Sequence, residues 1–420
     1  MWEAVFSREN LLRALQRVER NRGAPGVDGL TTAQLRGWLV EHWPEVRVAL
    51  EAGTYRPAPV RQVMIPKPDG RMRMLGVPTV LDRLIQQAIA QALTPIFDPA
   101  FSPFSFGFRP GRSAHQAVRA AQGFLDEGYR WVVDVDLDRF FDRVQHDVLM
   151  ARVARKVTDR KVLRLIRRYL DAGIMVEGVK QPSAEGTPQG SPLSPLLANI
   201  MLDDLDTELA RRGHRFVRYA DDLRVYLRSE RAAQRTLQNV SDFLQRRLRL
   251  QVNAAKSSVR SASTTVLLGF GFYFAAGGVS RIRVDPKAWA RMRVRVRELT
   301  RRNRSMRMDQ RIGLLNRYIT GWCAYFALAD TPRRFSDTDE WVRRRLRAVR
   351  WKEWKRPRTR VRALAALGVK RQNAYEWGNS RKGVWRIAGS APLQRAMPNA
   401  YWDDLGLHRF GERWTRLRHT

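Results

Sequence analysis

A pair of adjacent acids near the middle of the chain has the setting of a cation-binding turn. Asp221 and Asp222 are flanked by two runs of residues that favour β structure, 216–219 and 223–227. This pattern predicts a strand–turn–strand hairpin that carries both carboxylates at its tip. Two adjacent carboxylates repel each other unless a cation lies beside them, whereas an isolated pair at a turn is ordinarily just solvated. The neighbouring segments therefore decide between a solvated turn and a metal site.

A second acidic segment, 131–142, supplies the further carboxylates that a metal site needs. Strand alternation over 131–136 places the apolar side chains on one face and those of Asp134 and Asp136 on the other. Unpaired carboxylates on a strand of this buried type are costly. Three carboxylates from two neighbouring strand ends could hold two Mg²⁺ ions about 4 Å apart, which is the arrangement that supports in-line phosphoryl transfer. In such a site one ion activates a 3′-hydroxyl and the other binds the triphosphate.

Local signals predict the elements that must position these acids. The turn 66–70 lies between two β-prone runs and predicts a hairpin with basic residues on one face. Apolar spacing predicts a helix over 81–93, and the capping-box spacing of Ser113 and Gln116 predicts the start of another. The region after Asp285 has a mostly helical pattern, with breaks at three prolines, Pro332, Pro357 and Pro398.

Composition excludes several classes of protein. The 420 residues are 44% hydrophobic, which rules out a wholly disordered chain. Cys323 is the only cysteine, so the sequence encodes no disulfide framework and no cysteine-based zinc cluster. The six histidines are scattered without metal-ligand spacing. The start of the chain lacks a signal core, and glycines interrupt the longest uncharged stretch, 264–280, so we expect a cytoplasmic protein that spans no membrane.

The charge of the chain points to a polyanionic partner. It carries 77 basic and 41 acidic residues, a net charge of +36, and most of the basic ones are arginine. Residues 281–420 hold 36 basic and 12 acidic residues, and also nine of the 13 tryptophans. Interleaved basic and aromatic residues suit a surface that follows phosphates and stacks bases, although most of these tryptophans are expected to fill helix cores. An arginine-rich genome or an anionic membrane would also explain the composition. Nucleic acid is the partner we favour.

Several segments, in the same order along the chain, resemble the conserved blocks of group II intron-encoded reverse transcriptases. The box Tyr219-Ala220-Asp221-Asp222 is similar to their catalytic box, and 136–142 resembles their first catalytic strand. The resemblance covers nearly the whole chain, so it does not depend on one motif. The other matching segments are 105–113, 187–195, 266–270, 316–322, 351–357 and 398–407.

The resemblance implies the following roles for individual residues. Asp136, Asp221 and Asp222 would be the catalytic metal-binding acids, with Leu137 also at the metal and deoxynucleotide sites, and Asp134 is a rival for the first position. Lys256 would protonate the leaving pyrophosphate. Phe141 would pack under the incoming sugar and disfavour a 2′-hydroxyl, although it could be plain core. The remaining residues expected to bind the incoming deoxynucleotide are Lys67, Arg71, Arg73 and Gln189.

The implied fold is a right-hand polymerase of α+β class, with fingers, a palm built on an antiparallel sheet and a helical thumb. We expect the N-terminal extension and fingers, with part of the palm, over 1–130, and the palm with its acids over 131–280. The thumb or maturase domain X would cover 281–365, and a short basic DNA-binding segment 366–420. The sequence lacks the paired cysteines and histidines of the family's endonuclease, which places it with the endonuclease-lacking bacterial lineage, often called class C.

The implied activity is RNA-directed DNA synthesis on an intron RNA template, together with assistance to splicing and retrohoming. The expected partners are RNA template and group II intron RNA, a DNA primer or target, and deoxynucleoside triphosphates, with two Mg²⁺ ions as cofactors and Mn²⁺ as a substitute. Two alternatives stay open. One is a relative adapted to DNA repair or phage defence, and the other is a maturase that binds RNA but no longer polymerises. The oligomeric state does not follow from the sequence.

Overall fold

The computed structural model describes residues 1–66, 70, 72, 74–172, 174–176, 179–181 and 190–419, together with the backbone of Arg73. For strands β4 and β5, at 174–176 and 179–181, only the backbone is described. The chain divides into two compact units, Met1–Ser261 and Ala262–Thr420. In the described residues, no helix combines the length and the apolar character needed to cross a membrane.

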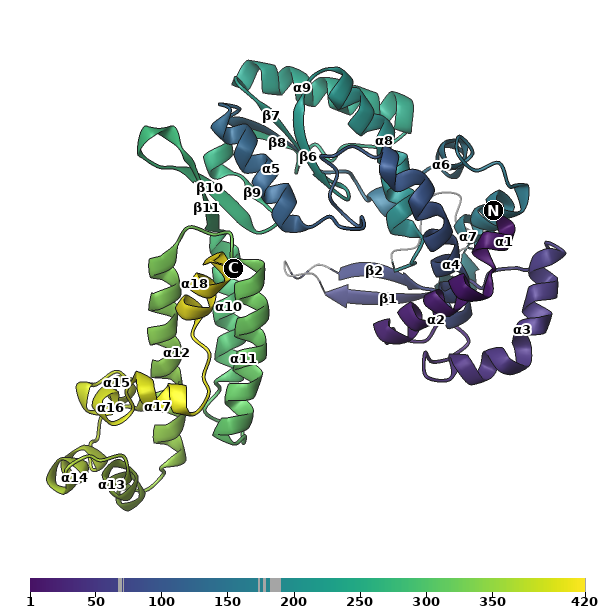
Figure 1. Ribbon diagram of the computed structural model, residues 1–420. Coiled ribbons are helices and arrows are strands. Elements are labelled where there is room, and N and C mark those ends of the chain that lie inside the picture. Colours follow the sequence, from purple (N-terminus) through teal and green to yellow (C-terminus); the bar gives the residue numbers. More distant parts are fainter. Residues whose placement is uncertain (67–69, 71, 173, 177–178, 182–189, 420) are drawn as a thin grey trace. The chain divides into compact units, whose positions relative to one another are not determined.

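The first unit contains a four-stranded antiparallel sheet, in the order β6-β7-β3-β8. Its strands are β3 (Trp131–Val135), β6 (Arg215–Tyr219), β7 (Asp222–Leu227) and β8 (Ser258–Ser261). Helices α5 (Ala114–Asp126), α8 (Ser194–Arg211) and α9 (Glu230–Phe243) contact these strands (Figure 1). The expected antiparallel sheet backed by helices is therefore confirmed. Its central strands are buried because apolar residues such as Val133 and Val225 pair across it.

A second sheet of the first unit contains the predicted basic hairpin. Strands β1 (Val60–Pro66) and β2 (Met72–Val77) pair in antiparallel register, and β4 (Ile174–Val176) and β5 (Val179–Gln181) extend the sheet in the order β2-β1-β4-β5. The helix predicted over 81–93 is α4 (Val80–Phe97), which carries Leu84, Ile85 and Ile89 into the core. The predicted capping box of Ser113 and Gln116 is present at the start of α5.

The first unit contains further helices, several of which pack on other helices. They are α1 (Trp2–Val5), α2 (Arg8–Asn21), α3 (Leu35–Glu51), α6 (His146–Val153) and α7 (Arg160–Asp171), with short helical turns at Asp98–Ala100, Phe140–Asp142 and Leu244–Leu248.

The second unit consists of a small sheet followed by helices (Figure 1). Segment 266–270 forms a tight turn between β9 (Val266–Leu267) and β10 (Phe270–Phe274), with Leu268 and Gly269 at φ of 52° and 82°, and β11 (Ser280–Val284) completes the sheet. Pro332 and Pro357 open helices, because the first helical position needs no backbone donor. The helices are α10 (Pro286–Leu299), α11 (Met308–Tyr325), α12 (Pro332–Glu353), α13 (Pro357–Ala366), α14 (Arg371–Gly378), α15 (Val384–Ala388), α16 (Ala391–Ala396), α17 (Asn399–Asp404) and α18 (Phe410–His419).

Tryptophans provide much of the core of the second unit. Trp289 and Trp322 pack against Phe335, with ring centroids 5.3 and 5.6 Å from it. Five of the nine tryptophans of this unit are buried, namely Trp289, Trp322, Trp351, Trp402 and Trp414. The expectation that most tryptophans fill helix cores is confirmed for these five.

Candidate catalytic site

The predicted hairpin with two acids at its tip is formed by β6 and β7. Tyr219 pairs with Asp222, so Ala220 and Asp221 are the two residues of the turn. Ala220 has a φ of 58°, in the left-handed region that L-residues rarely occupy. Such a conformation persists only where the surrounding structure imposes it. The turn is therefore held by its neighbours, which place Asp221 in the loop and Asp222 at the first position of β7.

The register of the central strands brings Asp136 beside this turn. In the β3–β7 pair, Asp134 lies opposite Arg224 and Val135 opposite Leu223. Continued by one residue, this register places Asp136 opposite Asp222. The loop before β8 fixes the same segment from its other side, since the amide of Asn253 donates to the carbonyl of Asp136 at 2.8 Å. The three acids predicted to act together thus come from the adjacent ends of two paired strands and their turn.

Lys256 also lies at this end of the sheet. Leu137 forms a bridge with Val252, and this pairing carries Lys256 to Asp136, where Nζ lies 3.4 Å from Oδ1. Both side chains are partly exposed, 46% and 38%. The structure therefore brings the predicted lysine next to a predicted acid, although the two are far apart in sequence.

Arg224 is a further charged residue of the site that the sequence reasoning did not identify. Its guanidinium contacts Asp222, and its Nη1 lies 2.6 Å from Oδ1 of Asp134. Burial raises the pKa of Asp134, Arg224 opposes the rise, and the carboxylates of Asp222 and Asp136 add to it. The contacts of Arg224 join Asp134 and Asp222 in one charged cluster. The signal for Arg224 was its position two residues after Asp222, on the same face of a strand.

A divalent cation fits this site by the chemistry of its donors. Carboxylate oxygens at the ends of adjacent strands are the ligands that hard cations prefer. Within the described residues, no three side chains of metal-ligating type form a ready-made metal site. Instead, Arg224 and Lys256 balance charge on the acids. A bound cation would take over part of this neutralisation. Leu137 could contribute only through its main chain, because its side chain is apolar and buried.

A buried network holds the turn in place. Nη1 of Arg218 donates to the carbonyl of Ala220 and to Oδ1 of Asn199, both at 2.9 Å, and Nη2 bonds Asp206 at 2.5 Å. The side chains of Arg218, Asp206 and Asn199 are at most 1% exposed. Asn199 also donates to the carbonyl of Gly107 at 2.9 Å, which joins segment 105–111 to the turn. These residues were not identified from the sequence, because their pairing depends on tertiary packing.

The remaining predicted residues are placed as follows. Phe141 is half-buried, packs against the core of the first unit and contacts Phe140, with ring centroids 5.1 Å apart. The backbone of Arg73 pairs with Ile65 in the β1–β2 hairpin, but its side chain is outside the description. Three predicted nucleotide-binding residues, Lys67, Arg71 and Gln189, also lie outside the described residues. Their roles stay predictions.

Comparison with known proteins identifies the class of this fold and site. Residues 65–272 match the model of the family "Reverse transcriptase (RNA-dependent DNA polymerase)". Residues 289–368 match that of "Group II intron, maturase-specific domain". The first unit thus contains most of a reverse transcriptase domain, whose members use divalent metal ions. The chain belongs to the group II intron-encoded reverse transcriptases.

Individual relatives are similar over about half of this chain. Protein YkfC of Escherichia coli is 40% identical over 192 residues, which are 45% of this chain and 50% of that protein. Group II intron-encoded protein LtrA of Lactococcus lactis is 39% identical over 194 residues, 46% of this chain and 32% of that protein. An uncharacterized 91 kDa protein in the cob intron of Schizosaccharomyces pombe is 34% identical over 203 residues, 48% of this chain and 25% of that protein. The matched part of this chain thus spans half or less of each of these relatives.

Proposed function

We propose that the chain is an RNA-directed DNA polymerase of a group II intron, which also acts as a maturase. It would extend a DNA primer on an RNA template, bind the intron RNA and assist its splicing and retrohoming in a bacterial cytoplasm. The observation that carries the proposal is the register of β3 and β7, which brings Asp136 beside Asp222 and the turn residue Asp221. The reverse transcriptase and maturase family matches support the same reading.

The reaction brings a triphosphate close to three carboxylates, so the site must offset the repulsion between these negative charges. The 3′-hydroxyl of the primer loses its proton to water, its oxygen attacks the α-phosphorus of a deoxynucleoside triphosphate and forms a new P–O bond, and the bond to the β-phosphate breaks as pyrophosphate leaves. We assign Asp136, Asp221, Asp222 and the main chain of Leu137 to hold two Mg²⁺ ions, which Mn²⁺ could replace. When bound, such ions lower the pKa of the attacking hydroxyl and neutralise the phosphates.

Other residues of the chain would bind and orient the substrates. Lys256, beside Asp136, is positioned to donate a proton to the departing pyrophosphate. Phe141, packed on Phe140 and half-buried, would lie under the sugar and exclude a 2′-hydroxyl. We assign Lys67, Arg71 and Arg73 to the triphosphate. We assign Gln189 to the contact with the incoming nucleotide and the template.

The division of labour along the chain follows from the same proposal. We assign 1–130 to the N-terminal extension and fingers, 131–280 to the palm, 281–365 to the thumb or maturase domain X, and 366–420 to a basic DNA-binding segment. The match of residues 289–368 to the maturase-specific domain supports the third assignment, and the high positive charge of residues 281–420 supports a nucleic acid partner for the last two.

A primer-extension assay with metal-site variants tests the proposal. Asp221→Asn and Asp222→Asn each remove a carboxylate charge, and the loss of several kcal/mol of charge stabilisation corresponds to at least about a hundredfold slower extension. Glu230→Gln, which removes an exposed carboxylate at the start of α9, is the matched control and should extend a primer like the parent chain. Full extension by Asp221→Asn would refute the site assignment. Tight RNA binding by a parent chain that never incorporates a nucleotide would favour a polymerase-silent maturase.

A further inference from the structure

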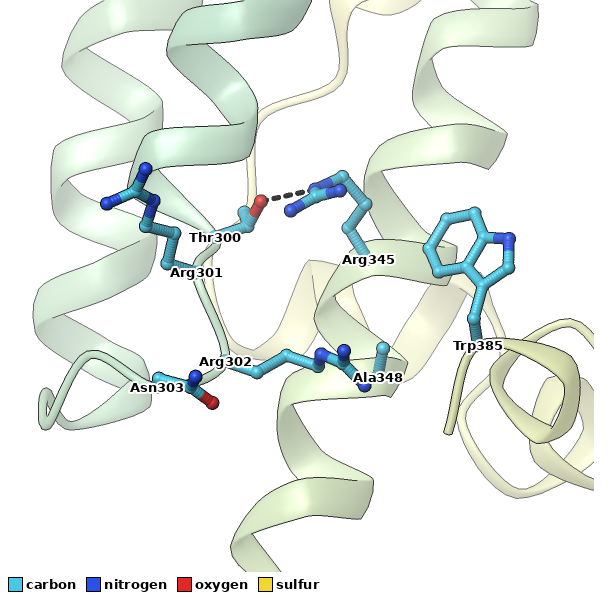
Figure 2. Close-up of a pocket in the computed structure, with 7 residues that line it drawn as sticks. All are labelled: Thr300, Arg301, Arg302, Asn303, Arg345, Ala348 and Trp385. Carbon is cyan, nitrogen blue, oxygen red and sulfur yellow. Dashed lines mark hydrogen bonds between the residues drawn. The ribbon is translucent and has the colours of Figure 1, made fainter. Parts of the chain in front are cut away.

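The second unit contains a basic hollow with an exposed tryptophan at its edge (Figure 2). Its lining comes from the loop after α10, from α12 and from α15, and its volume is 510 Å³, within the usual range of ligand sites. Trp385 is 42% exposed, unlike the five buried tryptophans of the unit. The residues drawn in Figure 2 are Thr300, Arg301, Arg302, Asn303, Arg345, Ala348 and Trp385.

Arg345, one of the arginines that line this hollow, has neutral hydrogen-bond partners. Nε of Arg345 donates to Oγ1 of Thr300 at 2.5 Å, and its Nη2 donates to the carbonyl of Arg297 at 3.3 Å. Burial lowers the pKa of Arg345, and the charges of Arg297 and Arg302 lower it further. In the part of the chain that the structure describes, Arg301, Arg302 and Arg345 form no ion pair with a carboxylate. A half-buried cation surrounded by like charges attracts an anion strongly.

Trp385 is held in a fixed position beside these cations. The guanidinium of Arg344 lies 4.2 Å from the centroid of its ring, and Nη2 of Arg344 donates to the Trp385 carbonyl at 3.0 Å. The guanidinium of Arg344 lies directly against the backbone of Gly389, since a Cβ at that position would come within 2.6 Å of its Nε. A pre-positioned ring loses little conformational entropy when a flat ligand stacks on it. Arg344 covers one face of the indole, so the opposite face is the platform on which an aromatic ring could stack.

A cluster of arginines surrounds a second tryptophan, Trp341, and shares Arg345 with the hollow. The ring of Trp341 on α12 has three guanidinium groups around it, those of Arg293, Arg297 and Arg345, at 5.7, 5.8 and 5.4 Å from its centroid. Arg293 and Arg297 are one helical turn apart on α10 and are both exposed. Cation–π contacts orient these groups without neutralising them. This cluster of unneutralised cations beside the hollow suits the phosphates of a nucleic acid strand.

We infer that this hollow binds an unpaired nucleotide of a single-stranded segment. The base stacks on Trp385, and the flanking phosphates contact Arg302 and Arg345. An acidic peptide would satisfy the arginines, but only a nucleotide carries a phosphate and a flat base in every unit, which matches cations and an indole side by side. The inference rests on the proposed function, because it names a contact that the nucleic acid partner makes. RNA and single-stranded DNA share this chemistry.

Binding of labelled oligonucleotides to the full chain tests the inference by fluorescence anisotropy. The probes are a short oligouridylate, an oligothymidylate of equal length and an RNA duplex. Trp385→Ala should weaken binding of a single strand about tenfold, because base stacking contributes about 1–3 kcal/mol, and Trp385→Phe should restore most of the affinity. Tyr375→Ala, which removes another exposed aromatic from α14 outside the hollow, is the matched control.

The salt dependence separates the two kinds of contact. Arg302→Ala should reduce the slope of log affinity against log salt by about 0.7 for a single strand, since one phosphate contact is lost. Trp385→Ala should leave that slope unchanged. The oligonucleotide that responds more strongly to Trp385→Ala identifies the source of the nucleotide as RNA or DNA.

Two comparisons, one between variants and one between probes, would overturn the inference. The first is an equal effect of Trp385→Ala and Tyr375→Ala on single-strand binding, and the second is an equal effect of Trp385→Ala on single strand and duplex. Primer extension by the parent chain is measured in parallel. Its absence would contradict the proposed polymerase but not the binding site, and an unaltered single-strand affinity of Trp385→Ala would contradict the binding site but not the polymerase.

Discussion

Arg224 offsets the electrostatic repulsion among the acids of the candidate catalytic site. Asp134, Asp136 and Asp222 lie at one end of the β3–β7 pair, and their mutual repulsion contributes to the raised pKa of Asp134. Arg224, only 9% exposed, offsets this repulsion from the strand position opposite Asp134. We expect Asp134 to serve the site mainly through this ion pair, because the register places Asp136, two residues further along, opposite Asp222.

Gly107 is the residue whose size most directly limits the position of the catalytic turn. A Cβ at this position would lie 2.3 Å from the backbone nitrogen of Ala220. Gly107→Ala should therefore displace the turn and slow primer extension on the order of a hundredfold, which is the effect of a displacement near 1 Å at reacting groups. The overpacking should lower the free energy of unfolding by about 1–3 kcal/mol, measured by urea denaturation.

A matched glycine controls for the general effect of an added methyl group. Gly123 lies inside α5 with no atom within 4 Å of its Cβ position. Gly123→Ala should raise the free energy of unfolding by about 1 kcal/mol, since alanine is the better helix former, and should leave extension unchanged. Equal extension rates for the two alanine variants would show that the contact of Gly107 with Ala220 does not control the turn.

At the scale of elements, β6 and α8 are joined by an ion pair that also supports the turn. Arg218 of β6 bonds Asp206 of α8 and the carbonyl of Ala220. Arg218→Met would leave the fully buried Asp206 carboxylate without its cation, which should cost about 3–5 kcal/mol of unfolding free energy. Arg215 lies on the same strand as Arg218 and forms an exposed ion pair with Glu127. Arg215→Met breaks this pair and should cost less than about 1 kcal/mol of unfolding free energy.

The double variant Asp206→Leu/Arg218→Met separates support of the fold from support of the turn. Replacing both charges with apolar side chains should recover most of the stability. Primer extension should stay well below that of the parent chain, because the carbonyl of Ala220 still lacks its donor. If the double variant regains both stability and full extension, the network only stabilises the fold.

The elements show which part of the structure could be predicted from the sequence. Alternating β-prone residues around Asp221 and Asp222 are a local signal, so the hairpin and its tip were predictable, as was the capping box at Ser113. The contact of Gly107 with Ala220 has no local signal, because it joins a loop to a turn that follows it much later in the chain. The same holds for the hollow at Trp385, whose lining comes from three separate segments.

At the scale of the whole molecule, the two units differ in charge. Residues 262–280 carry no charged side chain, so the second unit, Ala262–Thr420, holds the +24 of residues 281–420. The first unit carries the remaining +12 and contains the acids of the candidate catalytic site. Because most of the positive charge lies on the second unit, we expect this unit to make most of the phosphate contacts. The alternative is that both units contact phosphates to a similar extent.

Two matched pairs of arginines test this division by the salt dependence of binding. Arg293 and Arg297 are exposed one helical turn apart on α10, and Arg231 and Arg235 are exposed with the same spacing on α9. Replacing either pair with glutamine removes the same charge from the full chain. For a nucleic acid duplex, loss of the α10 pair should reduce the slope of log affinity against log salt by about 1.8, because each phosphate contact contributes about 0.9. Loss of the α9 pair should leave the slope unchanged. Equal reductions would mean that net charge, not its position on α10, governs binding, and a parent chain whose affinity did not change with salt would contradict phosphate recognition altogether.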